Sequence, residues 1–132
     1  MKWRNRERGS KMGNTRAVCP LGHSHRSQLE IAVCQITDLQ VKAGELELIR
    51  AEDTLYLSRA KIKYISDFKC RDLKTNEIFW REAKGFENDR WPIIKKLWSV
   101  YGPGRLEVWK GTHRRPFLQE TIIPKSDPKG EE

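Results

Sequence analysis

The chain has 132 residues, of which 37% are hydrophobic and 33% charged, and its formal net charge is +8. This length allows one domain with a buried core and is too short for two domains of ordinary size. No apolar run approaches the roughly 20 residues that span a bilayer. The hydrophobic content is also too high for a fully disordered chain. We therefore expect one globular domain with a strongly charged surface.

The cysteines and the start of the chain bear on its location. Cys19, Cys34 and Cys70 are widely spaced and form no CxxC pair, which favours reduced thiols over a disulfide framework. Cys19, His23 and His25 resemble half of a zinc site, but the second closely spaced ligand pair of a structural site is missing. The basic N-terminus lacks the apolar segment of a signal peptide. We therefore predict a cytoplasmic protein without a membrane segment.

Positive charge is concentrated near the N-terminus. Residues 1–26 contain seven Lys and Arg residues and a single acidic residue, Glu7. Neutralising nucleic-acid phosphates releases counterions, so this charge favours a nucleic-acid partner, although a solubilising tail explains it equally well. Residues 1–22 have no apolar period and predict a flexible basic arm. The side chains in and beside this arm that we expect to contact nucleic acid are Arg4, Arg6, Arg8, Lys11, Arg16 and Arg26.

A folded α/β domain is expected over residues 23–110. Apolar residues at helical spacing predict a helix over residues 24–43. Residues 46–58 then predict two short strands, with the adjacent acids Glu52 and Asp53 as turn residues between them.

The second half of this domain contains further strands and a helix. Strands are expected at residues 61–70 and 77–84, followed by a helix that begins near Asp89 as its N-cap. A last strand covers residues 105–110. The order helix, three strands, helix, strand predicts a mixed central sheet flanked by helices. Residues 111–132 are expected to form a tail, largely extended or disordered, with at most a short strand at 117–123.

Two acidic residues are expected to face each other within this sheet. Glu82 and Lys84 share one face of their strand because strand side chains alternate. If residues 73–76 form a four-residue hairpin loop, Asp67 lies opposite Glu82, with the Cβ atoms about 4.5–5.5 Å apart. Opposed carboxylates repel each other, and a divalent cation is the simplest compensation. A one-residue change of register would remove the pair, and Glu82 with Lys84 could then be a plain strand ion pair.

These residues resemble the motif of a known superfamily. Asp67 followed by Glu82-Ala-Lys84 resembles the (P)D…(D/E)xK pattern of the PD-(D/E)XK nucleases. Ser27-Gln-Leu-Glu30, Tyr64-Ile-Ser-Asp67-Phe68 and Glu82-Ala-Lys84-Gly85 are similar to small phage-encoded endonucleases of the Holliday junction resolvase type. The resemblance covers roughly residues 24–110 and implies a restriction-endonuclease-like αβββαβ core. Ser66 stands where that superfamily often has proline.

The resemblance implies a role for each site residue. The activity would be hydrolysis of DNA phosphodiester bonds with Mg²⁺ or Mn²⁺. Asp67 and Glu82 would bind the metal, and Glu30 would complete its shell directly or through water. Lys84 would orient or help activate the attacking water, or stabilise the transition state. Ser27 and Glu30 also have the spacing of a helix capping box, and both roles are compatible if Ser27 caps the helix while Glu30 turns inward.

The resemblance further implies branched DNA, such as a Holliday junction, as substrate. A homodimer would supply the two sites that two symmetric cuts require, in the cytoplasm of a host cell if the protein is phage-encoded. Near the second helix, Trp91 is a candidate for DNA contact, and Lys95 and Lys96 are either phosphate contacts or a solvated face. The alternatives are a nicking or single-strand DNA nuclease, a non-catalytic nucleic-acid-binding protein on the same fold, and an RNA-binding or ribosome-associated basic protein.

Overall fold

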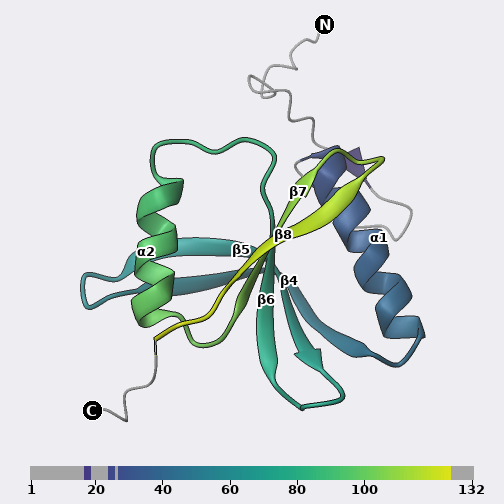
Figure 1. The fold of residues 1–132 in the computed structure, drawn as a ribbon, viewed down its shortest axis with the longest axis horizontal. Coiled ribbons are helices and arrows are strands. Elements are labelled where there is room, and N and C mark those ends of the chain that lie inside the picture. Colours follow the sequence, from purple (N-terminus) through teal and green to yellow (C-terminus); the bar gives the residue numbers. More distant parts are fainter. Residues whose placement is uncertain (1–16, 19–23, 26, 126–132) are drawn as a thin grey trace, which may run out of the picture.

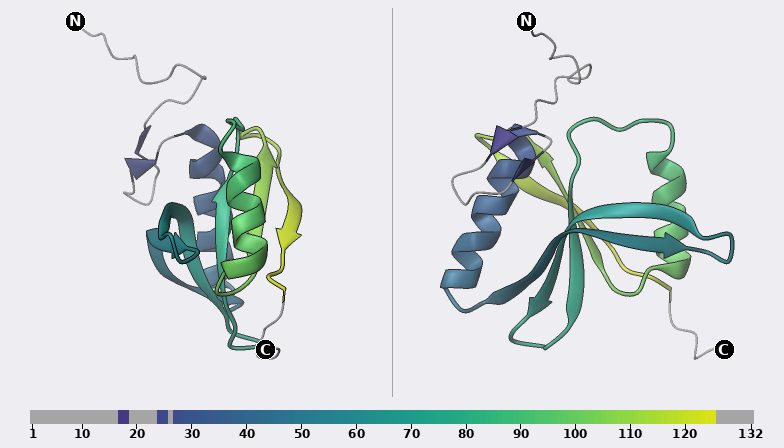
Figure 2. Two further views of the ribbon diagram at one scale, coloured as in Figure 1. Left: turned by 90° about the vertical axis from the view of Figure 1, so that its left-hand side faces the viewer. Right: turned by 180° about the vertical axis from the view of Figure 1, so that it is seen from behind.

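The computed structural model describes residues 17–18, 24–25 and 27–125. They form an α/β fold with a five-stranded mixed sheet and two helices. Helix α1 covers Gln28–Lys42 and helix α2 covers Trp91–Tyr101. The two helices lie on opposite sides of the crossing strands (Figures 1 and 2). Beside α1, strand β2 (Ala17–Val18) pairs with β3 (Ser24–His25) in a separate two-stranded sheet.

The main sheet has its strands in chain order, and only one neighbouring pair is parallel. Strands β4-β5-β6 and β7-β8 pair antiparallel, whereas β6 and β7 are parallel. A parallel pair needs a crossover connection, and α2 lies within it. The sheet strands are β4 (Leu46–Leu57), β5 (Ile62–Asp72), β6 (Ile78–Ala83), β7 (Leu106–Gly111) and β8 (Pro116–Ile122).

The β5–β6 hairpin has the register that its loop length predicts. The Asp72 amide donates to the Glu77 carbonyl at 2.8 Å, which closes the four-residue loop. Lys69 pairs with Trp80, and Phe68 pairs with Arg81. The regular ladder stops there, one residue before Asp67 and Glu82.

The core is divided between the two helices. In the first cluster, buried side chains of α1 pack against the sheet; its members are Leu29, Val33, Cys34, Leu46, Phe68, Cys70 and Phe79. In the second cluster, buried side chains of α2 pack against the sheet; its members are Leu57, Tyr64, Trp80, Trp91, Ile94, Trp98, Leu106 and Val108. Trp98 makes edge contacts with both Tyr64 and Trp80. Trp91, a candidate for DNA contact, packs within this second cluster and is only 2% exposed.

The turn expected at Glu52 and Asp53 is also wrong, because β4 is one strand of 12 residues. Glu52 has a left-handed backbone, with φ of 55°, yet the register with β5 is the same at Ala51 and Asp53, and the irregularity of the pairing lies between Leu48 and Arg50. An edge strand tolerates such irregularities because only one of its sides is paired. Asp53 is buried, and its Oδ2 accepts a hydrogen bond from Trp80 Nε1 at 2.9 Å.

Both helices begin later than predicted. α1 begins at Gln28 because Ser27 has an extended backbone and serves as the N-cap. α2 begins at Trp91, and Asp89 does not cap it. Asn88 acts in its place, because its Oδ1 accepts the amides of Arg90 and Trp91 at 3.1 and 3.0 Å.

The sheet extends past residue 110, where the sequence suggests that the domain ends. Residues 116–122 form β8, which pairs with β7 along its length. The Lys125 amide also donates to the Ser99 carbonyl of α2. Of the helices among the described residues, none is long and apolar enough to cross a membrane.

Candidate active site

Segments distant in the sequence meet at a pocket of about 220 Å³. They are the start of α1, the middle of β5, the end of β6 and the residues that follow β6. All four predicted catalytic residues, Glu30, Asp67, Glu82 and Lys84, line this pocket, which we call the carboxylate pocket. The rest of its wall is formed by Ser27, Ala83, Gly85, Phe86 and Asn88.

Glu30 reaches the carboxylate pocket from the first turn of α1. Ser27 Oγ accepts the Glu30 amide at 3.1 Å, so Ser27 caps the helix. The Glu30 side chain is only 3% exposed and faces inward. Ser27 therefore caps the helix while Glu30 turns inward, which is the arrangement that makes the two interpretations of this motif compatible. The helix dipole favours a carboxylate at this end.

Asp67 lies where the ladder between β5 and β6 has ended. Its Oδ2 accepts the Ala83 amide at 2.8 Å. This side-chain hydrogen bond links β5 to β6 beyond their last backbone pair, Phe68 with Arg81. The buried hydroxyl of Ser66 adds a second link, donating to the Arg81 carbonyl at 3.0 Å. Ser66, Asp67 and Phe68 are all buried, although strict alternation would expose one face of a strand.

Glu82 and Lys84 form the opposite wall. Tyr64 donates its hydroxyl to Glu82 Oε1 at 2.6 Å, and Lys84 Nζ lies 3.5 Å from Glu82 Oε2. The same Nζ lies 4.6 Å from the centre of the Trp91 ring, within the range of a cation–π contact. The Lys84 amide is held by the Trp109 carbonyl at 2.8 Å. The lysine is thus fixed between a carboxylate and an indole.

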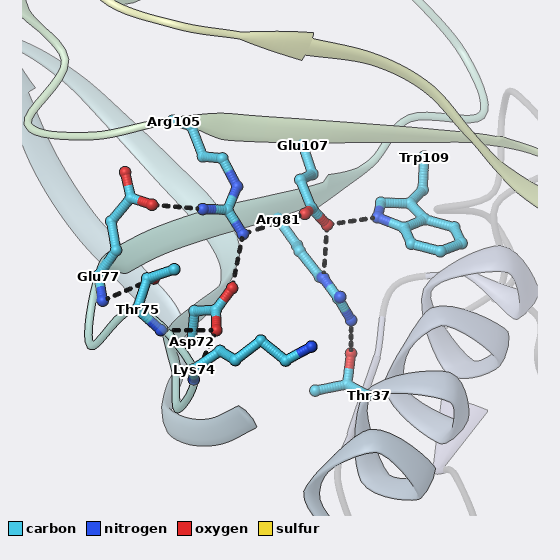
Figure 3. A network of polar contacts seen from close by, with 9 residues as sticks. All are labelled: Thr37, Asp72, Lys74, Thr75, Glu77, Arg81, Arg105, Glu107 and Trp109. Carbon is cyan, nitrogen blue, oxygen red and sulfur yellow. Dashed lines mark hydrogen bonds and ion pairs between the residues drawn. The ribbon is translucent and has the colours of Figure 1, made fainter. Parts of the chain in front are cut away.

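A polar network with a buried centre surrounds Arg81, the residue that precedes Glu82 in β6 (Figure 3). Arg81 donates from Nε to Glu107 Oε1 and from Nη1 to Thr37 Oγ1, each at 2.8 Å. Because Thr37 belongs to α1 and Glu107 to β7, one guanidinium joins the helix to both parallel strands. Trp109 Nε1 also donates to Glu107 Oε1.

Sequence reasoning missed this network, although a signal was present. Arg81 and Glu107 each interrupt an apolar stretch of a predicted strand. They pair directly in the β6–β7 register. Opposite charges at matched places in two buried strands predict an internal ion pair once those strands are recognised as neighbours.

The other predicted nucleic-acid contacts are not part of the carboxylate pocket. Lys95 pairs with Glu120 of β8 at 3.0 Å, and Lys96 is exposed on α2. Neither residue lines the pocket. Arg4, Arg6, Arg8, Lys11, Arg16 and Arg26 lie outside the described residues, as do Cys19 and His23.

The carboxylates do not form a ready-made metal cage. In the part of the chain that the structure describes, no group of three or more His, Cys, Asp or Glu side chains is arranged to hold a metal ion.

Comparisons of the chain with protein-family models, with curated proteins and with solved structures find no match. The functional conclusion therefore depends on the residues of this chain and their geometry.

Proposed function

We propose that the protein is a divalent-metal-dependent endonuclease that hydrolyses DNA phosphodiester bonds at the carboxylate pocket. The observation that carries the proposal is the convergence of Glu30, Asp67, Glu82 and Lys84 on one pocket. The three acids are at most 4% exposed. Placing three buried carboxylates around one pocket is costly because like charges repel and each must be desolvated, so their gathering is better explained by chemistry than by stability.

The donor set fits Mg²⁺ or Mn²⁺. Asp67 and Glu82 would hold the ion, and Glu30 would complete its shell directly or through water. Mg²⁺ is commonly bound by one or two carboxylates together with water and substrate phosphates, which agrees with a site that is not a complete protein cage. A bound ion supplies acidified water and neutralises developing oxygen charge. Lys84 Nζ orients the attacking water or stabilises the negative charge of the phosphate in the transition state.

This chemistry is compatible with the restriction-endonuclease-like core named above. The described order α1, β4, β5, β6, α2, β7 is the order that such a core requires. Together with the motif resemblance and the +8 charge, it favours branched DNA such as a Holliday junction as substrate and a homodimer as the active form.

The test compares a labelled four-way junction with a matched linear duplex, in Mg²⁺, in Mn²⁺ and in chelator. We expect metal-dependent symmetric cuts in the junction, and loss of cutting by at least about 100-fold in Lys84→Ala, because one electrostatic contact to the transition state is typically worth that much. Equal cutting of both substrates would remove the preference for junctions. Single cuts alone would favour a nicking enzyme.

A second candidate is a nucleic-acid-binding protein that does not cleave. It is favoured by the absence, among the described residues, of a three-ligand metal group. Asp67→Asn separates the two candidates, because it keeps a side-chain oxygen for the Ala83 amide but removes the charge. A binding protein should bind DNA as well or better, whereas a nuclease should lose cleavage.

A further inference from the structure

A second pocket adjoins the carboxylate pocket. Its volume is about 260 Å³, and it shares Glu82, Lys84 and Asn88 with the first. The two pockets therefore meet along the end of β6 and the segment before α2. The rest of the second pocket is formed by Lys63, Tyr64, Ile65, Arg90, Trp91 and Ile94, and we call it the basic pocket.

Cations outnumber acids in the wall of the basic pocket. Lys63, Lys84 and Arg90 face a single acid, Glu82, which already accepts the Tyr64 hydroxyl. Across residues 27–125, neither Lys63 nor Arg90 forms an ion pair with a carboxylate. By contrast, Lys95 of α2 pairs with Glu120, and Lys110 of β7 pairs with Glu87.

The two cations are held beside each other by the backbone. Arg90 donates from Nη2 to the Lys63 carbonyl at 2.7 Å. The guanidinium has five N–H donors, so this bond leaves others for a ligand. The bond holds the Arg90 guanidinium against the backbone of Lys63, and the side chains of both residues line the same pocket.

The start of α2 adds to this preference for an anion. The first turn of α2 contains no acidic residue, and its amides at Arg90 and Trp91 are capped by the uncharged Asn88 side chain, so the helix dipole still favours an anion here. Cationic side chains and the positive end of a helix both suit an oxyanion.

We infer that the basic pocket binds a backbone phosphate of the same DNA strand, next to the phosphate that lies in the carboxylate pocket. Lys63 and Arg90 would then be strand-positioning residues, and the strand would cross Lys84 between the pockets. This inference rests on the proposed function, because the direction of the strand is defined by the carboxylate pocket.

The first measurement is affinity without cleavage. Fluorescence anisotropy with a labelled four-way junction in chelator compares the natural chain with Lys63→Ala and Arg90→Ala. Each variant should bind about three- to tenfold more weakly, and the slope of log Kd against log salt should fall by about one for each lost phosphate contact. Lys74→Ala is the matched control, because it removes an exposed lysine from the β5–β6 turn, away from both pockets.

The second measurement locates the phosphate. Neutral methylphosphonates are placed one at a time along each strand around the branch point, and binding is measured again. One position should weaken binding by the natural chain but should not weaken Arg90→Ala further. Arg90→Lys should keep most of the affinity, and melting temperatures should show that the variants fold.

The outcomes separate this inference from the proposed function. Weakened binding in the two variants without any metal-dependent cutting by the natural chain would keep the phosphate site and remove the nuclease. Metal-dependent cutting, with both variants binding like Lys74→Ala, would keep the nuclease and overturn the phosphate site.

Discussion

Glu82 shows how single residues prepare the carboxylate pocket. A buried carboxylate needs donors, and Tyr64 supplies one at 2.6 Å while also packing between Trp91 and Trp98. One phenol thus joins the α2 core to the pocket. The orientation of Glu82 therefore depends on how Tyr64 packs in the α2 core.

Replacing Tyr64 by phenylalanine tests this link. Tyr64→Phe keeps the ring but removes the donor from a buried carboxylate, so the free energy of unfolding should fall by about 1–3 kcal/mol. Urea denaturation measures the change. Tyr56→Phe is the matched control, because that tyrosine is 62% exposed and its loss should cost less than about 0.5 kcal/mol. Equal losses in the two variants would contradict the structural role of the bond.

Cys70 provides a prediction at alkaline pH. Burial raises the pKa of its thiol to about 11 from an ordinary value of 9.0, because the charged thiolate is poorly solvated under α1. The unfolded chain releases this proton near pH 9 and the folded chain near pH 11. The folded state thus binds the proton more tightly between these values, and the thiol's contribution to stability is complete below pH 9 and lost as the pH rises to 11.

Chemical denaturation at pH 8, 9, 10 and 11 measures this contribution against Cys70→Ala. The difference between the two proteins should shrink steadily above pH 9. A difference that stays constant to pH 11 would show that the thiol ionises equally easily in both states. Ellman's reagent should also react with Cys70 much more slowly in the folded protein than in urea.

At the scale of elements, loop length made part of the site predictable. The four-residue loop between β5 and β6 fixed the register, and this placed Asp67 near Glu82. The approach of Glu30 could not be obtained this way, because it depends on how α1 packs against the sheet. The expectation that Glu30 approaches the site came from the motif resemblance. In the structure, Glu30 is buried and lines the same pocket as Asp67 and Glu82.

The errors in the predicted elements have local causes. Asp89 was a suitable N-cap by residue type. The side chain of Asn88, one residue earlier, instead accepts the amides of Arg90 and Trp91. The continuity of β4 through Glu52 was hidden because an adjacent acidic pair is typical of turns. Asp53 is instead kept in the sheet by Trp80, a partner 27 residues away that local sequence does not reveal.

The Arg81–Glu107 pair gives a prediction for the packing of α1 against the sheet. Arg81→Met leaves Glu107 buried with only Trp109 Nε1 and a more distant Arg105. Removing one partner of a buried pair typically costs about 3–5 kcal/mol. Because Arg105 remains 3.6 Å from Glu107, we expect a loss near 3 kcal/mol by urea denaturation.

Two further variants test whether that loss of stability comes from the uncompensated charge of Glu107. Arg81→Met combined with Glu107→Leu should recover most of the stability, because the uncompensated charge is gone. Arg71→Met is the control, since its pair with Glu47 is largely exposed and should contribute less than about 1 kcal/mol. If Arg81→Met cost no more than Arg71→Met, the network would not hold α1 in place.

At the scale of the whole molecule, each chain has one carboxylate pocket within its described residues, so under the proposed function a dimer would supply one site for each of the two symmetric cuts. We therefore expect a molar mass in solution of twice 15.5 kDa by light scattering.

Mixing the natural chain with an equal amount of Lys84→Ala, after dissociation and reassembly, should make about half of the dimers mixed. A mixed dimer has one competent site and should cut one strand, so nicked junctions should accumulate that neither protein alone produces. A monomer that cuts twice independently would be merely diluted by the variant, and the ratio of nicked to fully resolved product at equal total cutting would not change. The mixing experiment thus tests whether the two cuts come from two chains acting as one assembly.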